Sequence, residues 1–363
     1  MSETFVAAPD LPPPPSSVGA IGWMRNKLFK GWFNTTLTVL ALAFIASIVP
    51  PLVSWVLIDA TFTGDAATCR VAGGACWSFI GNGFKLFMIG IYPGSEAWRA
   101  LLSGALLAGL FIVTARHMLS PVVAAALWLL LPIPVYWLLG GGFGLEPVDS
   151  SKWGGLMLTL LLAVIGVVIS VPVGVLLALG RRSRFIAIKS LCVGLIELVR
   201  GVPLITLLFM ATIMLPLFLP EGIELGVMHR VQIGIIVFSS AYMAEVVRGG
   251  LQGIDRSQHE AAQALGLRNW PIMVFIVLPQ ALRDVLPPLI GRCIALLKDT
   301  SLVIVVGLLD FLGIAKAASQ DPEWLGFDAE AFVFSAAIYW VLCFSLSRYG
   351  RSLERRGHGA FRN

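Results

Sequence analysis

The chain has 363 residues, of which 57% are hydrophobic and only 13% are charged, and its mean hydropathy is +0.86. A soluble domain of this length could not bury so much apolar surface, so the composition indicates a polytopic membrane protein. The formal net charge of +5 does not indicate nucleic-acid binding, because the basic residues lie at the ends of apolar segments.

Apolar windows of about 20 residues, the length that crosses a bilayer as a helix, predict an all-α fold with about eight transmembrane helices. The residues before the first window, 1–33, contain a Pro-rich stretch, and we expect them to form a disordered cytoplasmic leader and entry. The predicted spans in chain order are Asn34–Ile58, Trp98–Ala115, Pro121–Leu139, Trp153–Leu179, Ile186–Phe218, Val231–Gly249, Val285–Leu312 and Ala331–Ser347.

The basic residues predict which side of the membrane each loop faces. With the amino terminus inside, the inner loops and ends hold 17 Lys and Arg residues, whereas the outer loops hold 6. Cytoplasmic loops carry such an excess of positive charge. We therefore expect both termini, and the polar stretch 250–283, to face the cytoplasm.

Two parts are predicted along the chain. Residues 34–151 contain three spans and an outer loop, 59–97, while residues 152–350 contain five spans and a basic tail follows at 351–363. Cys69 and Cys76 lie in the outer loop, where an oxidising compartment would favour a disulfide between them. Two free thiols are the alternative. The histidines show no metal-ligand spacing, so no metal site is expected.

The polar stretch 250–283 contains a helix-forming insert between two apolar spans. Ser257 followed by Glu260 predicts a capping box, and Gly266 suits the left-handed residue that ends a helix. Pro271 would begin a second short helix, which Pro279 would interrupt. An isolated helix of this length is only marginally stable in water, so we expect it to dock on a partner.

Seven positions of this insert resemble the coupling loop of ABC importer permeases, which reads E-A-A, three residues, Gly, nine residues, then I-x-L-P. They are Glu260, Ala261, Ala262, Gly266, Ile276, Leu278 and Pro279. Further stretches resemble the permeases of polar amino-acid ABC importers: Leu158–Arg181, Arg200–Phe209, Ala241–Gly250, Leu278–Arg283 and Lys298–Leu302. With its leading spans, the whole chain resembles the longer permease of broad-specificity (general) L-amino acid transporters.

This resemblance implies a type I ABC importer permease core of five helices with three extra N-terminal helices, in the bacterial inner membrane. It also implies a pair of ABC ATPase subunits, a second permease and a periplasmic amino-acid-binding protein as partners. The chain has no G-x-x-x-x-G-K-[ST] run, so ATP and Mg would be bound by the partner ATPase and no cofactor by this chain. No nucleophile and base are suitably spaced, so we do not expect an enzyme.

The seventh predicted span carries an unusual number of polar residues, which at membrane depth normally face a cavity or a partner. At about 100° per residue, Arg292, Asp299 and Asp310 fall within about 20° of one direction. An acid and a base together would suit an amino acid, and an internal ion-pair network is the alternative. The candidates for the substrate path are Arg292, Lys298, Asp299, Thr300, Ser301 and Asp310.

Two further acid–base pairs lie near the cytoplasmic ends of their helices. Glu197 with Arg200, and Glu245 with Arg248, are spaced so that they can pair within one helix. Gly201 and Pro203 should interrupt the long fifth span. These six residues are candidates for an inner gate, and interface pairs without a gating role are the alternative.

Together these features predict the transmembrane permease subunit of an ATP-driven amino-acid importer. A separate ATPase would drive alternating access through the loop between Glu260 and Pro279. An ion-gradient-driven secondary amino-acid transporter is the main alternative, although no internal sequence repeat supports it. A structural membrane anchor would leave the charges of the seventh span without a use.

Overall fold

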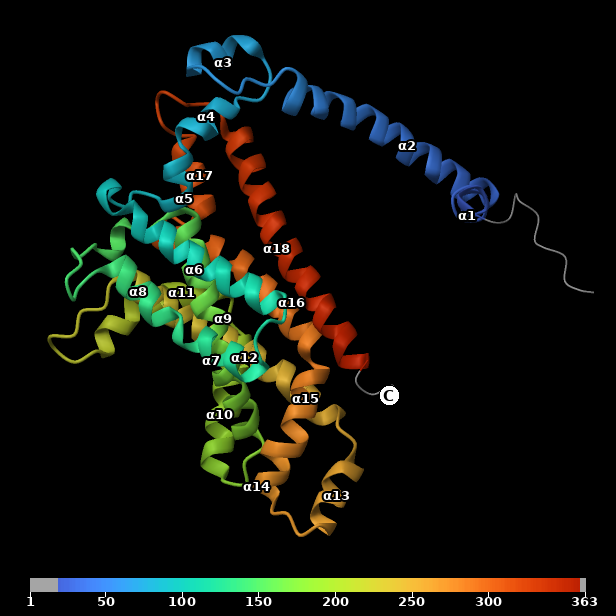
Figure 1. Cartoon of the computed structure of the whole chain (residues 1–363), viewed down its shortest axis with the longest axis vertical. Coiled ribbons are helices and arrows are strands. Elements are labelled where there is room, and N and C mark those ends of the chain that lie inside the picture. Colours follow the sequence, from blue (N-terminus) through green and yellow to red (C-terminus); the bar gives the residue numbers. More distant parts are fainter. Residues whose placement is uncertain (1–18, 360–363) are drawn as a thin grey trace, which may run out of the picture. The chain divides into compact units, whose positions relative to one another are not determined.

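The computed structural model describes residues 19–359, which form two compact units, residues 19–78 and 79–359 (Figure 1). The Pro-rich part of the predicted leader, residues 1–18, lies outside the described residues. The boundary that we placed after residue 151 stays a prediction.

The first unit contains one long apolar helix. Helix α1 (Gly19–Lys27) precedes α2 (Gly31–Val53), which a π-helical turn extends to Ile58. Part of the leader expected to be disordered is therefore helical. In α2, all of whose residues are described, no side chain is buried, and its Thr35 hydroxyl donates to the Gly31 carbonyl of the same helix. The outer surface of α2 is thus apolar, as lipid requires.

A small covalently closed structure follows α2. Cys69, on α3 (Ala66–Ala72), forms a disulfide with Cys76, and their Cα atoms are 5.5 Å apart. The predicted disulfide is confirmed. Asp65 caps α3 by accepting the Thr68 backbone N–H at 2.9 Å, and the donors of Thr68 hold the pKa of Asp65 below its usual value.

The second unit is entirely helical apart from its connections. Its elements are α4 (Trp77–Asn82), which begins at the end of the first unit, α5 (Phe84–Ile89), α6 (Ala97–Ala115), α7 (Pro121–Leu130), α8 (Pro132–Gly140), α9 (Gly155–Arg181), α10 (Ile186–Arg200), α11 (Leu204–Phe209), α12 (Val227–Gly253), α13 (Arg256–Ala264), α14 (Asn269–Pro271), α15 (Leu278–Asp284), α16 (Leu286–Asp299), α17 (Phe311–Ala318) and α18 (Asp328–Gly359). Helix α18 continues into the tail that we expected from residue 351, so most of that tail is helical.

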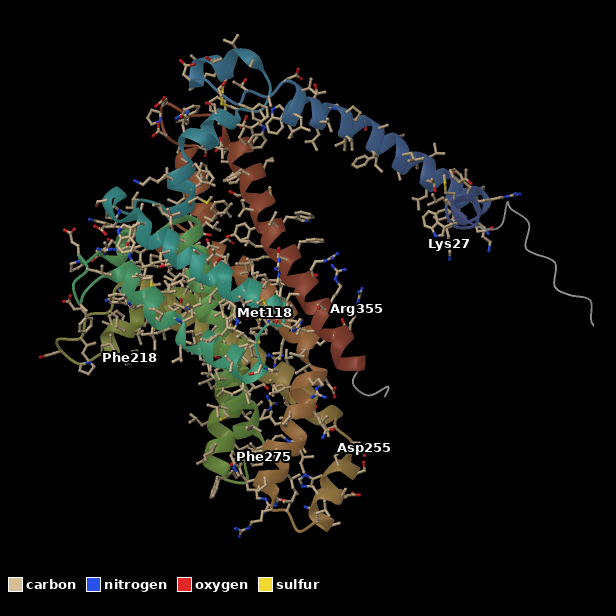
Figure 2. The ribbon with its side chains drawn as sticks, viewed as in Figure 1. Lys27, Met118, Phe218, Asp255, Phe275 and Arg355 are labelled. Atoms are coloured by element: carbon tan, nitrogen blue, oxygen red, sulfur yellow. A yellow bond between two sulfur atoms is a disulfide. The ribbon has the colours of Figure 1, made fainter. Side chains whose placement is uncertain are left out.

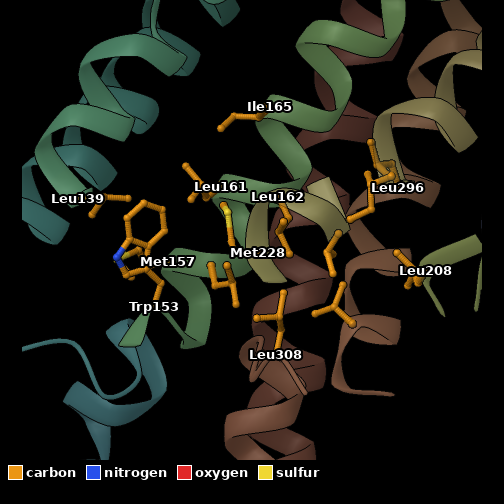
Figure 3. Packing of buried hydrophobic residues seen from close by; sticks show 14 of the residues in the cluster. Leu139, Trp153, Met157, Leu161, Leu162, Ile165, Leu208, Met228, Leu296 and Leu308 are labelled. Atoms are coloured by element: carbon orange, nitrogen blue, oxygen red, sulfur yellow. The ribbon is translucent and has the colours of Figure 1, made fainter. Parts of the chain in front are cut away.

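The core forms where α9 packs along α12. Leu162 and Ile165 of α9 lie in one apolar cluster with Leu208 and with Leu296 of α16 (Figure 3). Trp153 and Met228 close the same cluster at one end of α9 and α12. Side chains of α6 and α8 also join it, among them Ala100 and Leu139, so these two helices share a core with those after residue 151.

The described residues contain six helices long and apolar enough to cross a membrane, or seven if one bent pair counts as a span. The all-α membrane fold is confirmed. The bent pair is Ile186–Arg200 with Leu204–Phe218, whose axes differ by 111°, and the break lies at Gly201–Pro203 as predicted.

The predicted seventh span, Val285–Leu312, does not form one helix. Helix α16 ends at Asp299, a 3-10 segment covers Thr300–Val306, and Gly307 then adopts a left-handed conformation. Asp310 instead caps α17, because its carboxylate accepts the backbone N–H groups of Leu312 and Gly313. The prediction that Asp310 shares a helix face with Arg292 and Asp299 is therefore wrong.

Gly155 allows three segments to meet at the start of α9. Its φ is +64°, and its N–H donates to the Leu309 carbonyl at 3.0 Å. A Cβ atom added to Gly155 would lie 2.4 Å from the Phe87 carbonyl oxygen, so no other residue fits without movement. This crossing joins α5 and the segment before α17 to the core.

Gly155→Ala should therefore lower the melting temperature in detergent, because the left-handed conformation alone costs about 1–2 kcal/mol for a residue with a Cβ. Gly249→Ala is the matched control, since a Cβ added there meets no atom within 4 Å. Equal melting temperatures for the two variants would contradict the close crossing at Gly155.

Candidate functional site

The first candidate site is the coupling segment, residues 255–284, which begins with α13. Asp255 caps α13 by accepting the Ser257 backbone N–H at 2.8 Å, and this bond lowers the pKa of the carboxyl group. The predicted capping box is wrong, because the helix begins at Arg256 and Glu260 lies exposed in its interior. Asp255 precedes Ser257 and already supplies the acceptor.

The end of α13 is a Schellman turn. Gly266 has a φ of +78°, its N–H donates to the Gln263 carbonyl at 2.9 Å, and the Leu267 N–H donates to the Ala262 carbonyl at 3.2 Å. The predicted left-handed role of Gly266 is confirmed.

The second half of the segment is one continuous helical run. Helix α14 leads into a π-helical stretch, Ile272–Val277, and then into α15. Pro279 lies in the first turn of α15 and does not interrupt the run, because the preceding π-helical turn takes up the hydrogen-bonding mismatch that proline creates. The prediction of an interruption there is wrong. The Gln280 side-chain amide donates to Gln258 at 3.3 Å and links the two halves.

The coupling segment has an inner face that is built into the core. Ala262 of α13 and Ile272 and Val277 of the π-helical stretch pack in one apolar cluster with side chains of α9, α10 and α12: Ala178, Ile196, Ala244, Val247 and Leu251. In Figure 1, α13 and α14 lie at the same end of the second unit as α10.

Its outer face carries large apolar side chains that no described residue covers. Leu265 is 82% exposed, Trp270 is 67% exposed and Phe275 is 75% exposed. Figure 2 labels Phe275 and Asp255 on this segment. Ala261 is also exposed, whereas Ile276 and Leu278 are half-buried. The docking of a partner on this exposed apolar surface stays a prediction.

The second candidate site is a network of three arginines and two glutamates at the ends of α9, α10 and α12. Glu245 binds Arg248 at 2.9 Å and Arg181 at 2.8 Å, and Arg200 lies at 3.5 Å. Glu197 binds Arg181 at 2.9 Å, while its distance to Arg200 is 3.9 Å. The two predicted helix pairs are thus present and belong to one network. Sequence spacing did not reveal Arg181, because it reaches both acids only through the packing of three helices.

Tyr242 of α12 connects this network to α16. The Arg200 guanidinium lies 5.7 Å from the centre of the Tyr242 ring, and the Arg292 guanidinium lies 4.2 Å from it. These distances are typical of cation–π contacts. Arg292, one of the substrate-path candidates, therefore faces α12.

The remaining substrate-path candidates separate into two places. Lys298 and Ser301 line a cavity of about 250 Å³, together with Leu312 of α17 and a row of residues on α18: Phe332, Ser335, Ala336 and Tyr339. Asp310 is fully buried beside this cavity and accepts the Tyr339 hydroxyl at 3.1 Å. Asp310 thus has a structural role, because its carboxylate caps α17 and accepts the Tyr339 hydroxyl.

Asp299 and Thr300 lie next to the cavity residues in sequence without lining the cavity. Asp299 is half-buried, and the buried Thr300 hydroxyl donates to the Leu297 carbonyl at 2.8 Å. Within residues 19–359, no three His, Cys, Asp or Glu side chains are placed to hold a metal ion.

Glu245→Gln should lower the free energy of unfolding by about 1.5–3 kcal/mol, the range for hydrogen bonds to charged groups. Glu245 is only 15% exposed on its side chain and holds three arginines. Glu197→Gln should cost less than about 1 kcal/mol, because that side chain is 53% exposed and water screens its pairs. Thermal unfolding in detergent measures the loss of stability in each of the two variants. Equal losses would contradict the central place of Glu245 in the network.

Comparison with known proteins identifies relatives over the whole chain. Residues 170–358 match the family described as binding-protein-dependent transport system inner membrane component. The inner membrane amino-acid ABC transporter permease protein YhdY of Escherichia coli (strain K12) is 44% identical over 361 residues, 98% of each chain. The glutamate/glutamine/aspartate/asparagine transport system permease protein BztC of Rhodobacter capsulatus is 36% identical and aligns over 95% of each chain.

One solved structure supports the same relationship. A chain in the crystal structure of an amino acid ABC transporter with histidines is 32% identical, with a TM-score of 0.50. The match covers 56% of this chain and 92% of that one.

Proposed function

Because the chain belongs to the family of binding-protein-dependent transport system inner membrane components, we propose that it is the permease subunit of an ATP-driven amino-acid importer. The names of the relatives support amino acids as the substrate class. The observation that carries the proposal is the coupling segment, whose exposed apolar face is joined to three core helices by its buried face.

The partners follow from this role. A pair of ABC ATPase subunits binds ATP and Mg, and one of them receives Leu265, Trp270 and Phe275 in an apolar groove. A second, related permease supplies the other half of the pathway, and a periplasmic amino-acid-binding protein delivers substrate. The assembly lies in the bacterial inner membrane with both termini of this chain in the cytoplasm, as the basic residues predict.

Movement of the ATPase pair reaches the membrane through the packing of the coupling segment. Ala262 and Ile272 share their cluster with α9, α10 and α12, so a push on α13 displaces the ends of these helices. Those ends carry the arginine–glutamate network, which can break and re-form between inward-open and outward-open states.

Leu265→Ser combined with Trp270→Ser should reduce ATP-dependent uptake at least tenfold, because the ATPase loses two apolar anchors while the inner face of the segment stays intact. Uptake in inverted and right-side-out vesicles, and the amount of ATPase that co-purifies, measure this. Ile223→Ser is the control, since Ile223 is 53% exposed outside the coupling segment.

Unchanged uptake and ATPase recovery in the double variant would overturn the docking role of this face. Uptake that persists without ATP and follows an ion gradient would instead favour a secondary transporter.

Asp299→Asn should raise the half-saturating concentration for some amino acids more than for others, because it removes a half-buried negative charge that can bind an ammonium group. Uptake of acidic, neutral and basic amino acids, together with detergent melting, tests this role. A large fall in melting temperature with unchanged selectivity would show that Asp299 has a structural role only.

A further inference from the structure

Three helices meet around the ring of Tyr242, with a guanidinium from each neighbouring helix. Arg200 comes from the end of α10 and Arg292 from the middle of α16, and both lie within cation–π distance of the ring. Phe238, one turn earlier on α12, packs against Tyr242 with ring centres 4.8 Å apart and helps to hold the ring in place. The two arginines are therefore placed by tertiary packing.

Positive charge exceeds negative charge around this ring. Arg181 and Arg248 take the carboxylates of Glu197 and Glu245 at 2.8–2.9 Å, which leaves Arg200 with longer contacts of 3.5 and 3.9 Å. Among the residues that the structure describes, none forms a salt bridge with Arg292. Arg292 does interact electrostatically with Asp299. Four arginines are thus balanced by three carboxylates, and an excess of cations between apolar helices favours the binding of an anion.

The position is open to a ligand. The Arg200 side chain is 34% exposed, and Arg292 and Tyr242 are half-buried. A planar guanidinium offers paired N–H donors that match a carboxylate, and partial burial strengthens such charged hydrogen bonds. A phosphate group shares this chemistry, so a lipid headgroup or free phosphate must be distinguished from a carboxylate by experiment.

Asp299 lies on nearly the same face of α16 as Arg292, seven positions further along. Their backbones are separated by about 10 Å along the helix axis. The long Arg292 side chain covers part of that distance, and Arg292 interacts electrostatically with Asp299. The ammonium of a bound amino acid can therefore lie toward Asp299 when its carboxylate is held by Arg292.

We propose that Arg200 and Arg292, which both contact the Tyr242 ring, form a binding position for the α-carboxylate of the transported amino acid. This rests on the proposed function and adds a residue-level site to it. An arriving carboxylate replaces the contact of Arg200 with Glu245, which at 3.5 Å is the longest of the ion pairs that Glu245 makes with the described residues, and so removes one of the links between α10 and α12. The site thereby connects substrate passage to the arginine–glutamate network.

The test uses the full chain in the complex that it forms in the membrane, reconstituted in vesicles of zwitterionic lipid. Binding of L-glutamine is compared with binding of its α-amide, which lacks the carboxylate. The wild-type complex should prefer L-glutamine at least tenfold, and Arg292→Gln or Arg200→Gln should each remove most of that preference. Arg292→Lys should retain part of it, because the charge remains while the planar fork is lost.

Arg184→Gln is the matched control, because Arg184 is an exposed arginine between α9 and α10 that forms no salt bridge with the described residues of the network. Its preference for L-glutamine should equal that of the wild type. The melting temperature of each variant is measured alongside, and since a folding defect weakens both ligands equally, the ratio of the two affinities is unaffected by it.

Three results would overturn the proposal. The arginine variants could keep the full preference for L-glutamine, or they could weaken both ligands equally, which indicates a structural role only. The effect could also appear only in vesicles containing phosphatidylglycerol or with added phosphate, which identifies a lipid headgroup or free phosphate as the ligand. A wild-type complex that neither binds nor takes up amino acids would instead refute the proposed function.

Discussion

The coupling segment and the membrane helices share one apolar cluster, and the proposed mechanism depends on this contact. Ala262, Ile272 and Val277 pack directly against side chains of α9, α10 and α12. Because packed apolar clusters are nearly incompressible, the segment cannot move without moving those helix ends. The capped and terminated form of α13 makes the segment stiff enough to transmit such a movement, with Asp255 at its start and Gly266 at its end.

Charged side chains of the second unit form a network near the ends of the same three helices, α9, α10 and α12. Glu245 gathers arginines from α9, α10 and α12, and Tyr242 connects that network to Arg292 on α16. Paired charges of this kind hold helices together in one arrangement and can exchange partners in another. The apolar cluster and the charged network therefore lie on the same turns of α12, since Ala244 and Val247 of the cluster adjoin Glu245 and Arg248 of the network. The cluster is suited to transmitting movement and the network to responding to it.

Several features of the candidate sites could be predicted from local sequence. The glycine that ends α13, the helix break at Gly201–Pro203 and the Cys69–Cys76 disulfide all depend on residues close together in the chain. The start of α13 was predicted two residues late. By spacing, a cap made by the pair Ser257 and Glu260 is acceptable, and so is a cap made by Asp255 alone. The choice between them depends on where the backbone leaves α12.

By itself, the sequence determined the membrane class, most spans and the helix–turn–helix form of the coupling segment, because periodicity and capping act within a few residues. Tertiary structure decided the rest. It brought Arg181 to two acids on other helices, aligned Arg292 with Tyr242 and moved Asp310 to the cap of α17. Those outcomes depend on how helices distant in sequence pack and where a chain breaks, and a helical-wheel calculation cannot detect a break such as Gly307.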